Sequence, residues 1–112
     1  MNGLIYLEIA GNKIGVKFGM FAIEQLSKFE PTDSVVKMTT NTIWAGVLNY
    51  NEVKGPQLIT YGDLFEYVEE LLTNKDPLIS QIESCFIESK AYKSLMANVP
   101  QAVESDEEKK SD

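Results

Sequence analysis

Few of the side chains that usually carry out chemistry occur in this chain of 112 residues. It contains no histidine, so both the commonest general base and the commonest zinc ligand are absent. The single cysteine, Cys85, lies between Ser84 and Phe86 in an apolar pattern with helical spacing, and no histidine is present to deprotonate it. We therefore expect Cys85 to pack as a small hydrophobe, and we expect the protein not to be an enzyme.

Two other features could in principle hold a ligand. Glu66, Glu69 and Glu70 lie within one helical turn of each other and could bind a hard cation, but no calcium-loop or Glu-x-x-His pattern accompanies them. The glycines at 10–12 and 17–19 match neither a phosphate-binding loop nor a dinucleotide fingerprint. We interpret the glutamates as a solvated helix face and the glycines as turns, and expect no metal and no cofactor.

The charge composition excludes further classes of function. Ten basic residues, all of them lysine, oppose 17 acidic ones, which gives a net charge of -7. A domain that binds nucleic acid needs a cationic stripe and commonly reads bases with arginine, and an anionic membrane surface also attracts basic residues. We therefore expect neither nucleic acid nor membrane as a partner. With one cysteine and no secretory signal at the start, a cytoplasmic location is expected.

The elements that position these residues begin with a β-hairpin. Residues 4–9 and 13–18 alternate apolar and polar side chains, and Gly11 and Asn12 between them tolerate positive φ. A lone hairpin is only marginally stable, so its apolar face must be covered by helices of this chain or by strands of another copy. That face contains Ile5, Leu7, Ile9, Ile14, Val16 and Phe18, and the opposite face contains Tyr6, Glu8, Lys13 and Lys17.

About four helices follow the hairpin. Apolar spacing predicts a helix over 20–29, and a second over 33–50 that is capped by Thr32 or Asp33. Residues 51–59 read as a loop, because they contain Gly-Pro. Thr60 and Asp63 resemble a capping box at the start of a third helix, and Asp76-Pro77 begins a fourth that runs to about Met96.

The chain is therefore predicted to be an α+β protein with an N-terminal hairpin, mostly helical, and a single globular domain over residues 1–97. Residues 98–112 contain no aromatic side chain and are rich in acids, which predicts a disordered acidic tail.

The apolar residues of the second and third helices indicate a partner-binding surface. The segment 43–50 is apolar around most of its circumference, more than a helix with one covered side requires. Either a partner docks there, or this is a central helix buried on several sides. The candidate partner-binding residues are Ile43, Trp44, Val47, Leu48, Phe65, Val68 and Leu72.

Three segments carry a resemblance to a known family. They are 16–26 (VKFGMFAIEQL), 43–48 (IWAGVL) and 60–69 (TYGDLFEYVE). In this order, after a small hairpin, they resemble the tail assembly chaperones of long-tailed bacteriophages and their prophages. The match covers most of residues 4–90, and its motifs are patterns of residue types rather than a catalytic signature.

The resemblance implies a non-enzymatic role in the bacterial host cytoplasm. Members of the family coat the helical, apolar tape measure protein before the tail tube forms around it, and they self-associate. The implied partners are the tape measure protein, further copies of this chain and, through a frameshifted longer form, the tail tube protein. A different hypothesis remains open. The chain could be a small acidic interaction module, such as an antitoxin or a host-takeover protein, that binds a basic protein partner in a salt-sensitive way.

Overall fold

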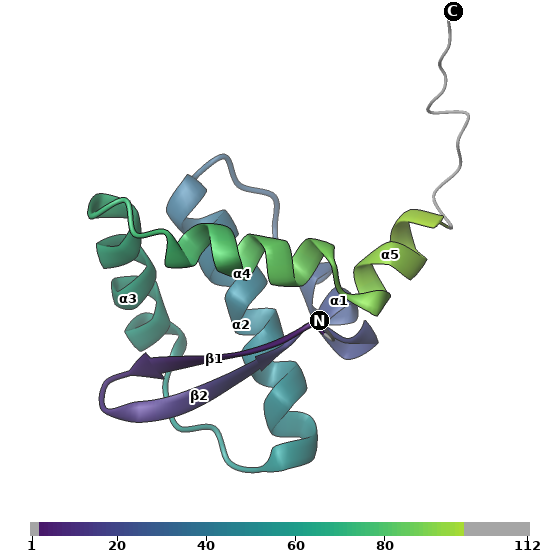
Figure 1. Cartoon of the computed structure of the whole chain (residues 1–112), viewed down its shortest axis with the longest axis horizontal. Helices are drawn as coiled ribbons and strands as arrows, with labels where there is room; N and C mark the ends of the chain where they lie inside the picture. The colour runs from purple at the N-terminus through teal and green to yellow at the C-terminus, as the bar shows by residue number, and fades with distance from the viewer. Residues whose placement is uncertain (1–2, 98–112) are drawn as a thin grey trace, which may run out of the picture.

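A computed structural model describes residues 3–97 and shows a two-stranded antiparallel sheet followed by five helices (Figure 1). The predicted class, an α+β chain with an N-terminal hairpin and mainly helices, is confirmed. The predicted tail, 98–112, lies outside the described residues. The elements are β1 (Leu4–Ile9), β2 (Asn12–Lys17), α1 (Met20–Leu26), α2 (Val35–Lys54), α3 (Tyr61–Thr73), α4 (Leu78–Ile87) and α5 (Lys90–Ala97).

The hairpin turn consists of Ala10 and Gly11, both with positive φ (52° and 80°). Two such residues form the tight turn whose twist matches that of the strands. The predicted turn included Asn12, but Asn12 already pairs with Ile9 as the first residue of β2. The predicted faces are confirmed. Leu7, Ile9, Ile14, Val16 and Phe18 are buried and Ile5 packs against them, whereas Tyr6, Glu8, Lys13 and Lys17 are exposed.

Helix α2 is the central element of the fold. In Figure 1 it runs behind the hairpin and α4, with α1 and α3 on either side. Its backbone comes close to β2 at Gly46, where an added Cβ would lie 2.4 Å from Val16 Cγ1. Ser34 caps the helix by accepting a hydrogen bond from the Lys37 amide, so the predicted cap at Thr32 or Asp33 was one or two residues too early. The helix also continues four residues beyond the predicted end at 50, to Lys54.

Helix α1 is held in place by α2 rather than by its own residues. The side-chain oxygen of Asn49 accepts hydrogen bonds of 3.0 Å from the amides of Gly19 and Ala22, at the start of α1. These amides belong to the first turn, which has no partner within the helix. Helix α1 ends at Leu26, three residues before the predicted end, with a short turn through Phe29.

The start of α3 confirms the predicted capping box. Thr60 Oγ1 accepts from the Asp63 amide at 3.1 Å, and Asp63 Oδ2 accepts from the Thr60 amide at 3.0 Å. Asp76 also acts as predicted, because its Oδ1 accepts from the Leu78 amide at the start of α4.

The predicted fourth helix is interrupted, so that α4 and α5 are separate. The break lies at Glu88 and Ser89. The Ser89 hydroxyl donates to the Phe86 carbonyl and accepts from the Tyr92 amide, so the residue ends one helix and caps the next. Ser89 is fully buried against Gly3, where an added Cβ would lie 2.8 Å from Ser89 Cβ. The start of the hairpin therefore packs against this break.

Candidate partner-binding surface

An open apolar groove lies between α2 and α4. The backbones of these helices have little close contact, and the space between them holds a hollow of about 510 Å³. One wall contains Val35, Met38, Thr39 and Thr42, which follow the i, i+3, i+4, i+7 row of one helix face. The other wall comes from α4, and Tyr92 of α5 adds to the lining. The α4 residues that line the groove are Ile82, Glu83, Phe86 and Ile87.

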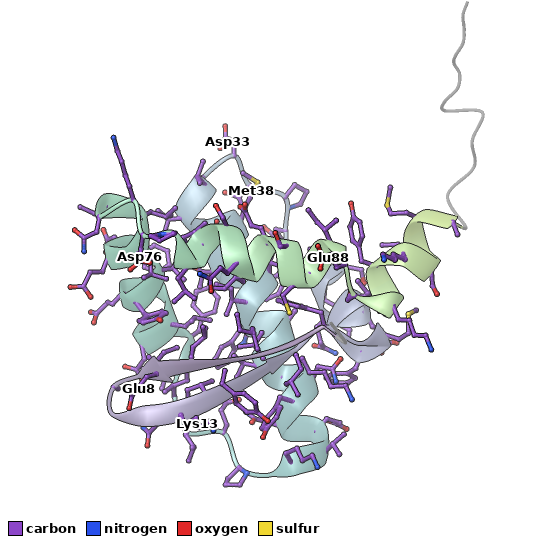
Figure 2. All side chains as sticks on the ribbon, in the orientation of Figure 1. Glu8, Lys13, Asp33, Met38, Asp76 and Glu88 are labelled. Carbon is purple, nitrogen blue, oxygen red and sulfur yellow. The ribbon has the colours of Figure 1, made fainter. Side chains whose placement is uncertain are left out.

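The rim of the groove is unusually apolar for solvent-exposed helices. Val35 is 58% exposed, Met38 46% and Ile87 52%. Figure 2 shows Met38 near the first turns of α2, beside α4. Single exposed apolar residues are ordinary, but several that line one hollow indicate a surface for an apolar partner.

The floor of the groove is continuous with the core. Ile43 and Ile82 are buried, and the ring of Phe86 packs on Phe18 of the core at 5.1 Å and on Tyr92 at 4.9 Å between centroids. The Thr42 hydroxyl donates to the Met38 carbonyl within α2. Its hydrogen therefore does not need a partner in the groove, and Glu83 is the charged residue of the lining.

The seven residues predicted to bind a partner separate into two groups. Ile43, Val47 and Val68 are at most 1% exposed and belong to the core, so the surface expected from them is not available in this structure. Helix α2 is apolar on several sides because the hairpin, α1 and α3 all pack on it, which is the second of the two interpretations given above. Trp44, Leu48, Phe65 and Leu72 are half-buried.

Two of the half-buried residues are brought together by Tyr61. Its ring packs edge-on against Trp44 at 5.8 Å and lies 6.4 Å from Phe65 between centroids. The Tyr61 hydroxyl donates to Asn41 Oδ1 at 2.6 Å, which fixes the ring between α2 and α3. Burial raises the pKa of Tyr61, so the phenol remains a neutral donor well above neutral pH. This aromatic row packs α3 on α2 and presents only part of its surface to solvent.

The other chemistry-bearing residues occupy ordinary positions. Cys85 is buried, and burial together with the negative charge of Glu88 raises the pKa of its thiol, which lowers its reactivity. Glu66, Glu69 and Glu70 are exposed on α3. Within residues 3–97, no group of three carboxylate, thiol or imidazole side chains is close enough to hold a metal ion.

Sequence reasoning missed the residues at the groove rim. Val35, Met38 and Ile87 fit the apolar rows of their own helices, and nothing local distinguishes them from core positions. The sequence does show that α2 carries more apolar residues than its neighbours can cover. This excess indicates which helix binds a partner but not which of its faces does so.

A comparison of the chain with family models, with curated proteins and with solved structures finds no match. None of the helices in the described residues is both long enough and apolar enough to cross a lipid bilayer.

Proposed function

We propose that this protein is a tail assembly chaperone of a long-tailed bacteriophage or prophage, which binds the tape measure protein in the bacterial cytoplasm and keeps it soluble during tail morphogenesis. It works by binding alone. The observation that carries the proposal is the groove between α2 and α4, because an open apolar hollow between two helices suits the apolar face of a partner helix.

The segments that carry the family resemblance support this proposal because they are neighbours in the fold. Gly46, in the second segment, packs against Val16 and Phe18 of the first. Asn49, just after the second segment, holds the start of α1 within the first. The resemblance therefore includes residues on which the packing of the hairpin and α1 against α2 depends.

The groove has the energetics that a reversible carrier needs. Full burial of one large apolar side chain contributes about 1.5–3 kcal/mol, so a partner helix that inserts a few such residues binds with useful affinity after ordering costs. The net charge of -7 keeps a loaded complex soluble.

The test is size-exclusion chromatography with light scattering, on the protein mixed with a helical fragment of the tape measure protein. We expect the wild type to form a complex. The double variant Met38→Glu, Ile87→Glu should weaken it at least about tenfold, because two unpaired charges would enter an apolar contact. Val53→Glu, Leu58→Glu is the matched control, because it adds the same two charges at side chains that are 69% and 53% exposed and do not line the groove.

The proposal fails if the wild type does not bind the fragment, or if the double variant binds as well as the wild type. Circular dichroism of the variants separates loss of binding from loss of fold. The rim side chains are about half exposed, so we expect both variants to remain folded.

A second candidate function, an acidic module that binds a basic protein, is favoured by one observation. Helix α3 carries Asp63, Glu66, Glu69 and Glu70 and no basic residue, and none of these carboxylates makes an ion pair within the described residues. If the partner is basic, binding should fall with Glu66→Lys, Glu69→Lys and with added salt, and should survive Met38→Glu, Ile87→Glu.

A further inference from the structure

Helix α5 presents a basic face that nothing in the described chain covers. Figure 1 shows α5 at one end of the molecule, where it packs against α1 and α4. Only its Ala91 is buried, whereas Lys90, Lys93 and Met96 are exposed and follow one i, i+3, i+6 row. Lys17 of β2 also lines the adjoining hollow of about 700 Å³, with Lys90, Lys93 and Met20, and Glu88 is the acidic residue of this lining. Three lysines and one glutamate thus lie around the hollow, so this surface is basic on balance although the protein is acidic.

Helix α3 presents a face of opposite charge and the same spacing. Leu64, Val68 and Leu71 point into the core, which leaves Glu66 and Glu69 exposed on the opposite side. Glu66 and Glu69 therefore have the same three-residue spacing as Lys90 and Lys93. Residues three apart on a helix are neighbours about 5–6 Å apart between Cβ atoms, so the two lysines of one helix can face the two glutamates of another when the helices lie parallel.

The charges of the two rows are unpaired within one molecule. Among the described residues neither lysine and neither glutamate makes an ion pair within 4.0 Å. Helices α3 and α5 lie at opposite ends of the molecule in Figure 1, so the α5 face of one copy can meet an α3 face only on another copy.

We propose that the Lys90–Lys93 face of α5 binds the Glu66–Glu69 face of α3 in a second copy of this chain. Lys90 would pair with Glu66, and Lys93 with Glu69. Charge complementarity selects the second copy, and both faces are on formed helices, so little ordering is needed on contact. The contact joins two different surfaces, so it builds a ring or an open chain of copies rather than a symmetric dimer. It does not involve the groove and stands independently of the tape measure protein.

The test is sedimentation velocity of the whole chain over a concentration series, at about 20 mM and about 300 mM salt. We expect the wild type to self-associate weakly at low salt and less at high salt, because exposed ion pairs are weak and screened. Two double variants reverse the charge of one face each: Lys90→Glu, Lys93→Glu on α5, and Glu66→Lys, Glu69→Lys on α3. Each variant by itself should weaken self-association by roughly tenfold or more, because like charges then face each other.

Mixing the two double variants provides the decisive measurement. The α5 face of the first variant is now negative and can bind the α3 face of the second variant, which is now positive. The unchanged α5 face of the second variant can still bind the unchanged α3 face of the first. Association should therefore return in the mixture to the wild-type level, which no misfolded variant could achieve. Lys28→Glu, Lys54→Glu is the matched control. It makes the same change in net charge on exposed lysines outside the row, and should stay close to the wild type.

Other results overturn the proposal. A wild type that stays monomeric at low salt removes the contact. If association is lost when Lys90 and Lys93 are reversed but persists when Glu66 and Glu69 are reversed, the basic face binds another acidic segment, such as residues 104–108. The absence of rescue in the mixture would exclude α3 as the complement. The variant Met38→Glu, Ile87→Glu should self-associate as the wild type does. Failure of the proposed contact between copies can therefore be distinguished from failure of the groove proposal.

Discussion

At the scale of single residues, the closest packing between the sheet and the central helix depends on a missing side chain. Gly46 of α2 faces β2, where an added Cβ would lie 2.4 Å from Val16 Cγ1 and 3.0 Å from Phe18 Cε1. Both neighbours are buried and at most 1% exposed, so neither can move into solvent. Gly46 therefore sets the distance between α2 and the hairpin.

We predict that Gly46→Ala lowers the free energy of unfolding by about 1–3 kcal/mol, because the extra methyl group overpacks the core. Urea unfolding followed by circular dichroism measures the change. Gly62→Ala is the matched control. A Cβ there meets only Thr60 Oγ1 at 3.7 Å, so alanine should stabilise α3 by up to about 1 kcal/mol through its helix propensity. Equal effects of the two changes would contradict the close approach of α2 to β2.

The buried thiol gives the fold a pH dependence with a defined sign. Burial and then the charge of Glu88 raise the pKa of Cys85, and burial also raises the pKa values of Tyr61 and Tyr67. The folded state therefore holds these protons more tightly than the unfolded state. As the pH rises above the unfolded thiol pKa of about 8.5, the unfolded chain ionises first, and stability falls until the folded groups ionise as well.

We predict that the urea midpoint falls as the pH rises from about 8.5, the unfolded thiol pKa, to about 10. The Cys85→Ala variant, although less stable overall, should lose less over the same interval because it lacks one of the titrating groups. A midpoint that is constant or rises with pH would show that these groups do not hold their protons more tightly in the folded state.

At the scale of elements, the parts that the sequence predicts well are those with local causes. The hairpin faces follow from alternation, and the start of α3 follows from a capping box closed by Thr60 and Asp63 only three residues apart. In contrast, the start of α1 is capped by Asn49. This residue accepts a hydrogen bond from the Ala22 amide, although it lies 27 residues later in the chain. No local pattern carries that information, because an asparagine inside α2 looks like a weak helix former.

The break between α4 and α5 shows the same limit. The apolar spacing continues across Glu88 and Ser89, and serine is an ordinary residue in helices, so one long helix was the natural prediction. The break accompanies tertiary packing, in which Ser89 is buried against Gly3 at the start of the hairpin. The candidate site was hard to place for a related reason, because burial of α2 on several sides depends on where α1, α3 and β2 lie.

We predict that Ser89→Ala destabilises α5 more than the rest of the fold, by about 1 kcal/mol, because the helix loses its cap at the Tyr92 amide. Amide hydrogen exchange measures this directly. Protection should fall in residues 92–97 and persist in α2. Ser84→Ala, an exposed position inside α4, should leave exchange in α5 unchanged. Uniform loss of protection in the Ser89 variant would show that the residue supports the core rather than the cap.

At the scale of the whole molecule, charge is distributed by element rather than balanced locally. Helix α3 carries acids and no base, whereas β2 and α5 carry lysines and no acid. No lysine of residues 3–97 makes an ion pair with a carboxylate. The fold is therefore stabilised by its core and its caps, and its charges remain available for contacts with other molecules.

This distribution predicts that salt acts in opposite directions on folding and on self-association. A chain of net charge -7 without internal ion pairs in its described part is destabilised by repulsion, which salt screens. We expect the melting temperature to rise or stay constant between about 20 mM and about 300 mM salt, whereas association between copies weakens. The measurement is best made by calorimetry on the variant Lys90→Glu, Lys93→Glu, which should be monomeric. Because this variant is more negative than the wild type, its melting temperature should rise more with salt. A melting temperature that falls with salt would mean that attractive charge pairs stabilise the fold itself, and would leave fewer charges free to join one copy to the next.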